Sequence, residues 1–107
     1  MKLALTYQDF CSQLEGRSVG TSFTGLIQEV VYDSRKINQS PGLAFFALNG
    51  PFRNGHDYLS DAYAKGVRVF VVHQVPVNNW SDASFIVVNH TLLALQMLAG
   101  HYRKQLN

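Results

Sequence analysis

Residues 31–58 read VYDSRKINQSPGLAFFALNGPFRNGHDY, and this stretch decides the fold. Its run at 43–48 is apolar without alternation, which is the pattern of a strand covered on both faces. A second apolar run, VRVFVV at 67–72, follows Gly66. Four residues between the two runs share one face of a predicted helix: Tyr58, Leu59, Ala62 and Tyr63. A strand, a helix and a strand within about thirty residues predict a right-handed βαβ unit.

Towards the amino terminus, Thr6 is expected to cap a helix that runs to Glu15, with Gly16 as its left-handed stop. Residues 17–25 are mostly small and polar and predict a connection. The run at 26–32 predicts a strand. Its alternation assigns four residues to two faces: Val30 and Tyr32 to one, Ile27 and Val31 to the other.

Towards the carboxyl terminus, Asp57 is expected to cap the helix of the βαβ unit. Trp80 is interpreted as a cover over the core, and residues 85–88 predict a short buried strand. A final helix is expected from residue 92 to about 105. Its predicted apolar face consists of Leu92, Leu95, Ala99, Tyr102 and Leu106. Together, these strands and helices predict a small three-layer α/β domain, with a mostly parallel sheet and helices on both faces.

Composition limits the class of protein. The chain has 107 residues, 47% hydrophobic and 15% charged, as expected for one ordinary globular domain. Its nine Lys and Arg residues are scattered, so no nucleic-acid partner is expected. No apolar run is long enough to span a bilayer, so we expect a cytoplasmic protein without a membrane partner. The single Cys11 falls on the apolar face of the first predicted helix and is expected to pack in the core.

No motif for catalysis or metal binding is complete in the sequence. A phosphate loop, with glycines before Lys-Ser or Lys-Thr, is absent, and so is a Rossmann fingerprint. The four His residues lie far apart and lack partners at metal-ligand spacing. We therefore expect no catalytic residue, no metal ligand and no cofactor within residues 1–107.

Asp33, Ser34 and Arg35 follow a predicted strand directly, and strand ends in open α/β sheets are where ligands bind. The Ser34 hydroxyl can both donate and accept a hydrogen bond, which suits the edge of a pyrimidine. The alternative is an Asp-Ser turn with Arg35 in a surface salt bridge, and the residues alone leave both interpretations open.

The loop after residue 48 combines aromatic, cationic and glycine residues. Phe52 offers a flat surface for stacking, Arg53 offers a cation for a phosphate, and the glycines on either side of Pro51 allow close backbone approach. His56 lies where this loop enters a predicted helix N-terminus, which suits an anion. A role for His56 in stabilising the turn is the alternative.

Four segments, taken in order, resemble the N-terminal domain of the Mur ligases: DSRK at 33–36, PGLAFFAL at 41–48, NGHDY at 54–58 and residues 62–72. The resemblance extends from about residue 26 to the end of the chain. Within the family, the sequence looks most like the ligase that adds D-alanyl-D-alanine to UDP-N-acetylmuramoyl-tripeptide. The residues at 65–72 are also similar to a form that is fused to an alanine racemase.

The resemblance implies that the chain holds the UDP end of a UDP-N-acetylmuramoyl-peptide in bacterial peptidoglycan synthesis. A central domain of the same protein would bind ATP and Mg, and a C-terminal domain would admit the dipeptide. Residues 1–107 alone, a single substrate-binding domain, are therefore expected to be inactive. Carried over by position, the resemblance places Tyr32 and Ser34 at the uridine, with the loop Pro51, Phe52 and Arg53 closing over the nucleotide. The neighbouring candidates for the uridine and diphosphate site are Arg35, Asn54, Gly55 and His56.

Two other functions stay open. The ligase that adds the third amino acid to the same precursor has the same Asp-Ser-Arg and Gly-His-Asp elements in its first domain. A non-catalytic nucleotide-sensing or interaction module of the same fold is the second. That module predicts that no ATP-binding loop follows residue 107.

Overall fold

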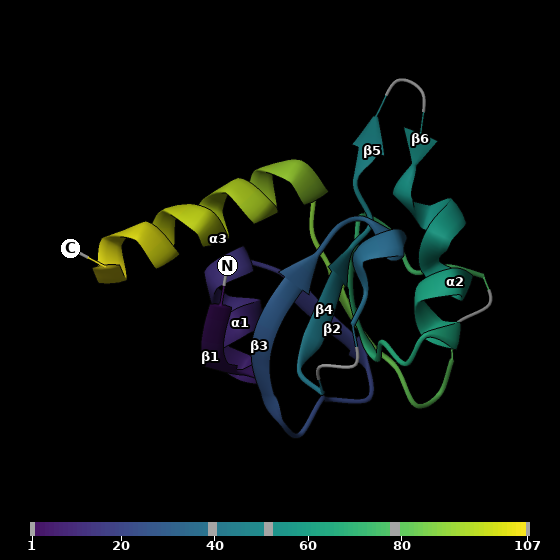
Figure 1. The fold of residues 1–107 in the computed structure, drawn as a ribbon, viewed down its shortest axis with the longest axis horizontal. Coiled ribbons are helices and arrows are strands. Elements are labelled where there is room, and N and C mark those ends of the chain that lie inside the picture. The colour runs from purple at the N-terminus through teal and green to yellow at the C-terminus, as the bar shows by residue number, and fades with distance from the viewer. Residues whose placement is uncertain (1, 39–40, 51–52, 78–79, 107) are drawn as a thin grey trace.

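A six-stranded sheet organises the chain, and the computed structural model describes residues 2–38, 41–50, 53–77 and 80–106 (Figure 1). The sheet has the order β1-β3-β4-β7-β8-β2. Its strands are β1 (Lys2–Thr6), β2 (Arg17–Gly20), β3 (Leu26–Val31), β4 (Leu43–Phe46), β7 (Val69–Val72) and β8 (Ser84–Val87). A separate hairpin consists of β5 (Asn49–Gly50) and β6 (Arg53–Asn54). The helices are α1 (Tyr7–Leu14), α2 (Leu59–Ala64) and α3 (Thr91–Leu106), with two 3₁₀ helices, η1 (Ser34–Lys36) and η2 (Gly55–Tyr58).

The four central strands, β3, β4, β7 and β8, are parallel. The edge strands differ, because β1 pairs antiparallel with β3, and β2 pairs antiparallel with β8. Helices α1 and α3 cover one face of the sheet and α2 covers the other. The predicted βαβ unit is β4, α2 and β7. The predicted fold class, a three-layer α/β domain with a mostly parallel sheet, is confirmed.

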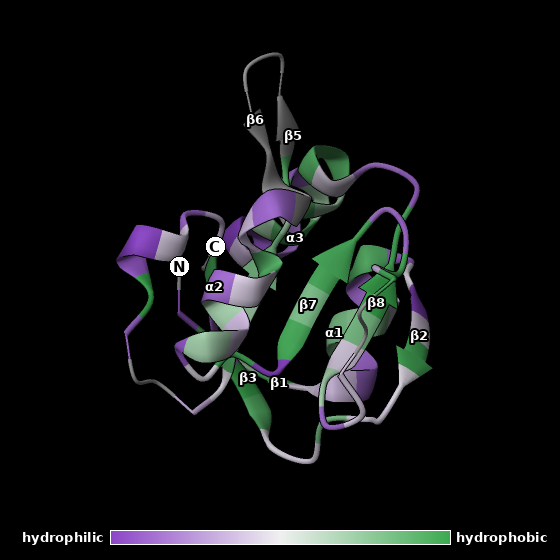
Figure 2. Ribbon diagram, turned by 90° about the vertical axis from the view of Figure 1, so that its right-hand side faces the viewer, coloured by the Kyte–Doolittle hydropathy of each residue, from purple (hydrophilic) through white to green (hydrophobic). Residues whose placement is uncertain are grey.

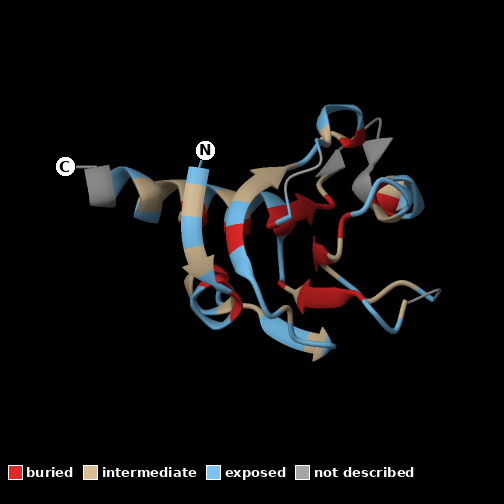
Figure 3. Cartoon of the chain, turned by 60° about the horizontal axis from the view of Figure 1, so that its bottom comes forward, coloured by how far each residue is buried: buried red, intermediate tan, exposed pale blue. Residues whose placement is uncertain are grey.

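Consecutive residues of β4 point to opposite faces, which explains its unbroken apolar run. Phe46 meets Phe10 of α1 edge to face, with ring centroids 6.2 Å apart. Phe45 meets Phe70 of β7 in the other layer, at 6.5 Å. Strands β7 and β8 carry hydrophobic colouring in Figure 2, and the nearly complete burial of β4, β7 and β8 corresponds to the red strands in Figure 3. The prediction of strands covered on both faces is confirmed.

The two edge strands were not predicted. The expected connection at 17–25 is wrong over Arg17–Gly20, which pairs along its length with β8. Every second residue of β1 is exposed, and most of β2 is exposed as well. Edge strands of this kind lack the continuous apolar run by which a central strand is recognised.

Helix α1 begins as predicted but ends differently. The amide of Asp9 donates to Oγ1 of Thr6, at 3.1 Å, so Thr6 is the N-cap. Glu15, not Gly16, takes the left-handed conformation after the helix, with φ at 53°. Gly16 meets another need, since a Cβ atom there would lie 2.4 Å from Cγ2 of Ile86. Glycine at this position lets the chain pass close to β8.

Strand β3 contains an irregularity that changes which residues face the core. The amides of residues 28 and 29 both donate to the carbonyl oxygen of Gly42, at 2.8 and 3.2 Å, which is the pattern of a β-bulge. Ile27 and Val30 consequently pack on the α1 and α3 side, and Val31 packs on the α2 side. The predicted pairing of Ile27 with Val31 on one face is wrong because the bulge shifts the alternation by one residue.

The predicted cap of α2 is also wrong. Asp57 lies inside η2, and the residue before α2 is Tyr58, whose side chain makes no capping hydrogen bond. The 3₁₀ turn therefore leads directly into the helix. Gly66 follows α2 with φ at 103°, so the predicted stop is confirmed.

Helix α3 packs through a different stripe from the one expected. Its buried residues are Thr91, Ala94 and Leu98, whereas Leu92 is 41% exposed. The prediction is right for Leu95, which packs against the core, and wrong for Leu92. The helix starts one residue earlier than predicted, after His90, whose Nδ1 accepts a hydrogen bond from the amide of Leu93. None of the helices in the described ranges is long and apolar enough to cross a bilayer.

Candidate functional site

The turn that follows β3 is built around Asp33. Its Oδ1 accepts hydrogen bonds from the amide of Arg35 at 3.0 Å and from Nε of Arg35 at 3.1 Å, and its Oδ2 accepts one from Nη2 at 2.9 Å. The hydrogen bond to Asp33, and then the carboxylate charge, raise the pKa of the Arg35 guanidinium. The predicted Asp-Ser turn with an Arg35 salt bridge is therefore present. The Arg35 side chain is 76% exposed, so the ion pair adds little stability.

Ser34 is the buried residue of this turn, with 6% of its surface exposed. Its carbonyl oxygen accepts a hydrogen bond from Nζ of Lys65, at 2.8 Å. Its hydroxyl has no hydrogen-bond partner among the residues that the structure describes. Buried hydroxyl groups are usually paired, so an unpaired one marks a place for a further hydrogen-bonding group.

Two tyrosines flank the turn. Tyr32 follows β3 and is 60% exposed, so its ring is accessible beside Ser34 in the chain. Tyr58, at the end of η2, is close enough to make a small contribution to the raised pKa of Arg35, after the larger effects of Asp33. The turn after β3 and the segment before α2 therefore lie near each other.

The β5–β6 hairpin follows β4, the parallel neighbour of β3, and projects beyond the sheet in Figure 1. Since parallel strands end at the same edge, the hairpin and η1 both follow the carboxyl edge of the sheet. Pro51 and Phe52 lie outside the described residues. For residues 53–56 the structure describes the backbone course, with Arg53 opposite Gly50. The predicted contacts of Pro51, Phe52, Arg53, Asn54, Gly55 and His56 with a ligand stay predictions.

A second polar group, which we name the Asp82 cluster, includes Tyr63 near the C-terminal end of α2. It consists of Tyr63, Arg68, Trp80 and Asp82. Tyr63 donates its hydroxyl to Asp82 at 2.7 Å, and Nε of Arg68 donates to the same carboxylate at 3.1 Å. The Tyr63 ring lies between the Arg68 guanidinium, 3.8 Å from its centroid, and the Trp80 ring, with centroids 4.2 Å apart. The predicted role of Trp80 as a cover over the core is confirmed.

The polar side chains of Tyr63, Arg68 and Asp82 are bonded to one another and to the backbone. The hydrogen bond from Tyr63 is the main cause that lowers the pKa of the Asp82 carboxyl, and the same bond raises the pKa of Tyr63. Arg68 also donates from Nη1 to the carbonyl oxygens of Tyr63 and Val67, each at 2.9 Å. These contacts describe a structural cluster rather than a ligand site.

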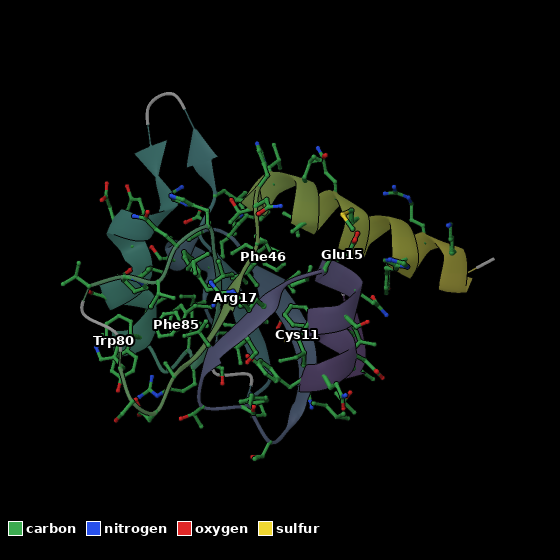
Figure 4. All side chains as sticks on the ribbon, turned by 180° about the vertical axis from the view of Figure 1, so that it is seen from behind. Cys11, Glu15, Arg17, Phe46, Trp80 and Phe85 are labelled. Atoms are coloured by element: carbon green, nitrogen blue, oxygen red, sulfur yellow. The ribbon has the colours of Figure 1, made fainter. Side chains whose placement is uncertain are left out.

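A cavity of about 550 Å³ lies near the amino end of β3, between α1 and the loop before β3. Its lining includes Tyr7, Cys11, Ser18 and Phe23. The Tyr7 hydroxyl and Oγ of Ser18 are 2.8 Å apart, and burial raises the pKa of Tyr7 to about 12. Burial also raises the pKa of the Cys11 thiol, which packs against the core as predicted. Figure 4 shows Cys11 between α1 and the sheet, away from Trp80 and Phe85.

Lys65 is the residue of the candidate site that the sequence did not reveal. Its contact with Ser34 joins positions 31 residues apart, and no local pattern predicts such a pair. Within the described ranges, no three His, Cys, Asp or Glu residues gather as a metal site would require.

Comparisons with known proteins cover most of the chain. The profile described as Mur ligase family, catalytic domain, matches residues 26–103. A UDP-N-acetylmuramoyl-L-alanyl-D-glutamate–2,6-diaminopimelate ligase of Clostridium perfringens is 36% identical over 76 residues, which are 71% of this chain and 15% of the relative. A UDP-N-acetylmuramoyl-tripeptide–D-alanyl-D-alanine ligase of Buchnera aphidicola is 36% identical over 80 residues, which are 75% of this chain and 16% of the relative.

A solved structure gives the same likeness over nearly the whole chain. It is the UDP-N-acetylmuramoylalanyl-D-glutamyl-2,6-diaminopimelate–D-alanyl-D-alanyl ligase from Acinetobacter baumannii, with a TM-score of 0.84 and 27% identity. The match covers 97% of this chain and 22% of that structure. The chain thus spans 15% to 16% of the length of the two curated relatives. These relatives give no support to the suspected fusion with an alanine racemase.

Proposed function

The chain belongs to the Mur ligase family, and we propose that it is the N-terminal substrate-binding domain of an ATP-dependent peptidoglycan-precursor ligase. Its proposed task is to hold the UDP end of UDP-N-acetylmuramoyl-tripeptide while D-alanyl-D-alanine is added. The solved relative whose name specifies a D-alanyl-D-alanyl ligase supports this choice, because the likeness covers almost the entire chain.

The observation that carries the proposal is the state of the Ser34 side chain. Its hydroxyl is buried, lies in the turn directly after a central parallel strand, and has no partner among the described residues. A uracil edge alternates hydrogen-bond donors and acceptors, and a hydroxyl can answer either kind. The Asp33–Arg35 contacts fix the backbone around Ser34, so the hydroxyl would meet the base in a preset position.

The neighbouring residues have proposed roles of their own. The exposed Tyr32 ring would lie against the nucleoside, and Arg35 would add positive charge near the diphosphate. The loop from Pro51 to His56 would close over the nucleotide from the hairpin. These roles rest on the resemblance and on the common edge of the sheet.

ATP and Mg are proposed to bind in a central domain of the same protein, outside residues 1–107. That domain and the UDP-precursor are the proposed partners, and a cytoplasmic location is proposed from the family. The peptide bond would be made in the central domain's site. Residues 1–107 would contribute substrate position alone.

A ligase that adds the third amino acid is the second candidate, because the relative from Clostridium perfringens carries that activity in its name. Both ligases would hold a UDP-precursor in this domain. Assay of the parent protein with D-alanyl-D-alanine and with 2,6-diaminopimelate separates them. A non-catalytic module is tested by the sequence after residue 107, where a ligase requires a glycine-rich loop with Lys and Thr.

The binding proposal is tested by calorimetric titration of the chain with UDP and with UDP-N-acetylmuramoyl-tripeptide. Ser34→Ala is expected to weaken binding of both by about tenfold, the loss of roughly one good hydrogen bond. Ser12→Ala, at an exposed position on α1, is the matched control and should bind as the unmodified chain does. Equal affinities for Ser34→Ala and the unmodified chain would remove Ser34 from the site.

A further inference from the structure

We propose that Lys65 is a positioning residue for the nucleotide site, acting through the backbone of Ser34. Its ammonium group lies 2.8 Å from the Ser34 carbonyl oxygen. This inference rests on the proposed function, since it concerns how the Ser34 hydroxyl reaches its place. Lys65 itself is not proposed to touch the ligand.

Contacts within α2 also hold Lys65 in place. It is the C-cap residue of α2, and its backbone amide donates to the carbonyl oxygens of Asp61 and Ala62, both at 3.1 Å. One helical turn earlier, Oδ2 of Asp61 lies 3.2 Å from Nζ. The backbone and the ammonium of Lys65 are thus both restrained, and the side chain spans from α2 to the turn at Ser34.

The turn needs an external support because it is short. Helix η1 has three residues, and its own hydrogen bond runs from the amide of Lys36 to the carbonyl oxygen of Asp33, at 2.9 Å. Short 3₁₀ segments have poor hydrogen-bond geometry. The Asp33 contacts with Arg35 set the shape of the turn but do not join it to another element. Among the hydrogen bonds between described residues, the Lys65 contact alone ties Ser34 to α2.

The same contact leaves one group of Ser34 for a ligand. The carbonyl oxygen is occupied by Lys65, and the hydroxyl has no described partner. The side chains of Lys65 and Asp61 are 41% and 49% exposed, so their attraction is screened and the expected effect on folding is small. A change at Lys65 should therefore affect ligand binding more than stability.

The test compares three variants of the chain by titration with UDP, with urea unfolding as a parallel measurement. Lys65→Met keeps the length of the stem but removes the ammonium, and should weaken UDP binding about fivefold. Lys65→Arg keeps a cationic donor and should restore most of the affinity. Lys104→Met, at an exposed position of α3, is the matched control. All three urea midpoints should stay close to that of the unmodified chain.

A second readout follows the turn without ligand. Amide hydrogen exchange at residues 34–36 should become faster in Lys65→Met and stay unchanged in Lys104→Met. Unchanged UDP affinity together with unchanged exchange in Lys65→Met would overturn the inference. A loss of affinity that only follows a loss of stability, with no rescue by Lys65→Arg, would overturn it as well.

The same experiments distinguish failure of the proposed nucleotide site from failure of the proposed Lys65 role. If the unmodified chain and Ser34→Ala respond equally to UDP, the nucleotide site at Ser34 is wrong, whatever Lys65 does. In that case faster exchange in Lys65→Met would still support the tie between α2 and the turn. If Ser34→Ala weakens binding and Lys65→Met does not, the nucleotide site stands and the positioning role falls.

Discussion

Segments 32–36 and 80–84 share three kinds of residue in the same order and use them differently. Each has an aromatic residue, then an aspartate, then a buried serine: Tyr32, Asp33 and Ser34 in the first, Trp80, Asp82 and Ser84 in the second. In the second segment the Trp80 ring stacks on Tyr63, Asp82 accepts from Tyr63 and Arg68, and the Ser84 hydroxyl donates to the carbonyl oxygen of Thr21.

In segment 32–36 the aromatic ring and the serine hydroxyl do not make the corresponding contacts with described residues. Tyr32 is 60% exposed, and the Ser34 hydroxyl has no partner in the described part of the chain. Residue type and burial are therefore not enough to assign a role. The two segments differ in whether their polar and aromatic groups find partners within the described part of the protein. This difference supports the proposal that segment 32–36 binds the nucleotide, whereas segment 80–84 is structural.

The largest expected difference concerns the aromatic residues. Trp80→Ala should lower the free energy of unfolding by about 2 kcal/mol, because the ring stacks on Tyr63 and covers the core beside Phe85. Tyr32→Ala should leave it nearly unchanged, since the ring is exposed. Urea denaturation of both variants measures the two values, and Val77→Ala, at a side chain 99% exposed, is the control for the Trp80 loop. Equal losses for the two aromatic residues would break the contrast.

The two buried serines should show a smaller difference in their contribution to the free energy of unfolding. Ser84→Ala should lower the free energy of unfolding by about 1 kcal/mol, because the Thr21 carbonyl oxygen loses its donor. Ser34→Ala should cost almost nothing, because a hydroxyl without a partner contributes no bond to folding. The same urea series decides this. A loss at Ser34 as large as the loss at Ser84 would indicate that Ser34 is a structural residue.

The smallest expected effect is the loss of the stabilisation by the Asp82 carboxylate at low pH. The hydrogen bond from Tyr63 lowers the folded-state pKa of Asp82, so the carboxylate stabilises the fold above its unfolded pKa, about 4. That stabilisation is lost as the pH falls through the lower folded-state pKa. Asp82→Asn should be less stable than the unmodified chain at pH 7, and this difference in stability should become smaller below pH of about 4. Thermal unfolding of both chains across this pH range measures the difference. A difference in stability that stays constant with pH would contradict the assigned pKa shift.

Much of the fold could be predicted because its signals are local. The apolar runs of β4 and β7 and the helix between them identified the βαβ unit, since strands covered on both faces need apolar residues throughout. The Thr6 cap of α1 was predictable for the same reason, as its partner Asp9 lies three residues away. The Asp33 turn is also local.

The remaining features depend on contacts between distant residues. The bulge in β3 depends on the carbonyl oxygen of Gly42, more than ten residues further along the chain, and it changed the face assigned to Ile27. The edge strands depend on their pairing with β3 and β8 rather than on their own pattern. Lys65 reaches Ser34 across the sequence, and the absence of a described partner for the Ser34 hydroxyl could be seen only in three dimensions.

The most direct test of the account is a titration of the ¹⁵N-labelled chain with UDP, followed by its amide resonances. We predict that the resonances of residues 32–36 shift in a saturable way, while those of residues 80–84 and of Tyr7 and Cys11 at the 550 Å³ cavity stay in place. Saturable shifts confined to residues 80–84 or to that cavity, with residues 32–36 unmoved, would contradict the claim that the Ser34 hydroxyl, which has no partner among the described residues, marks the nucleotide site.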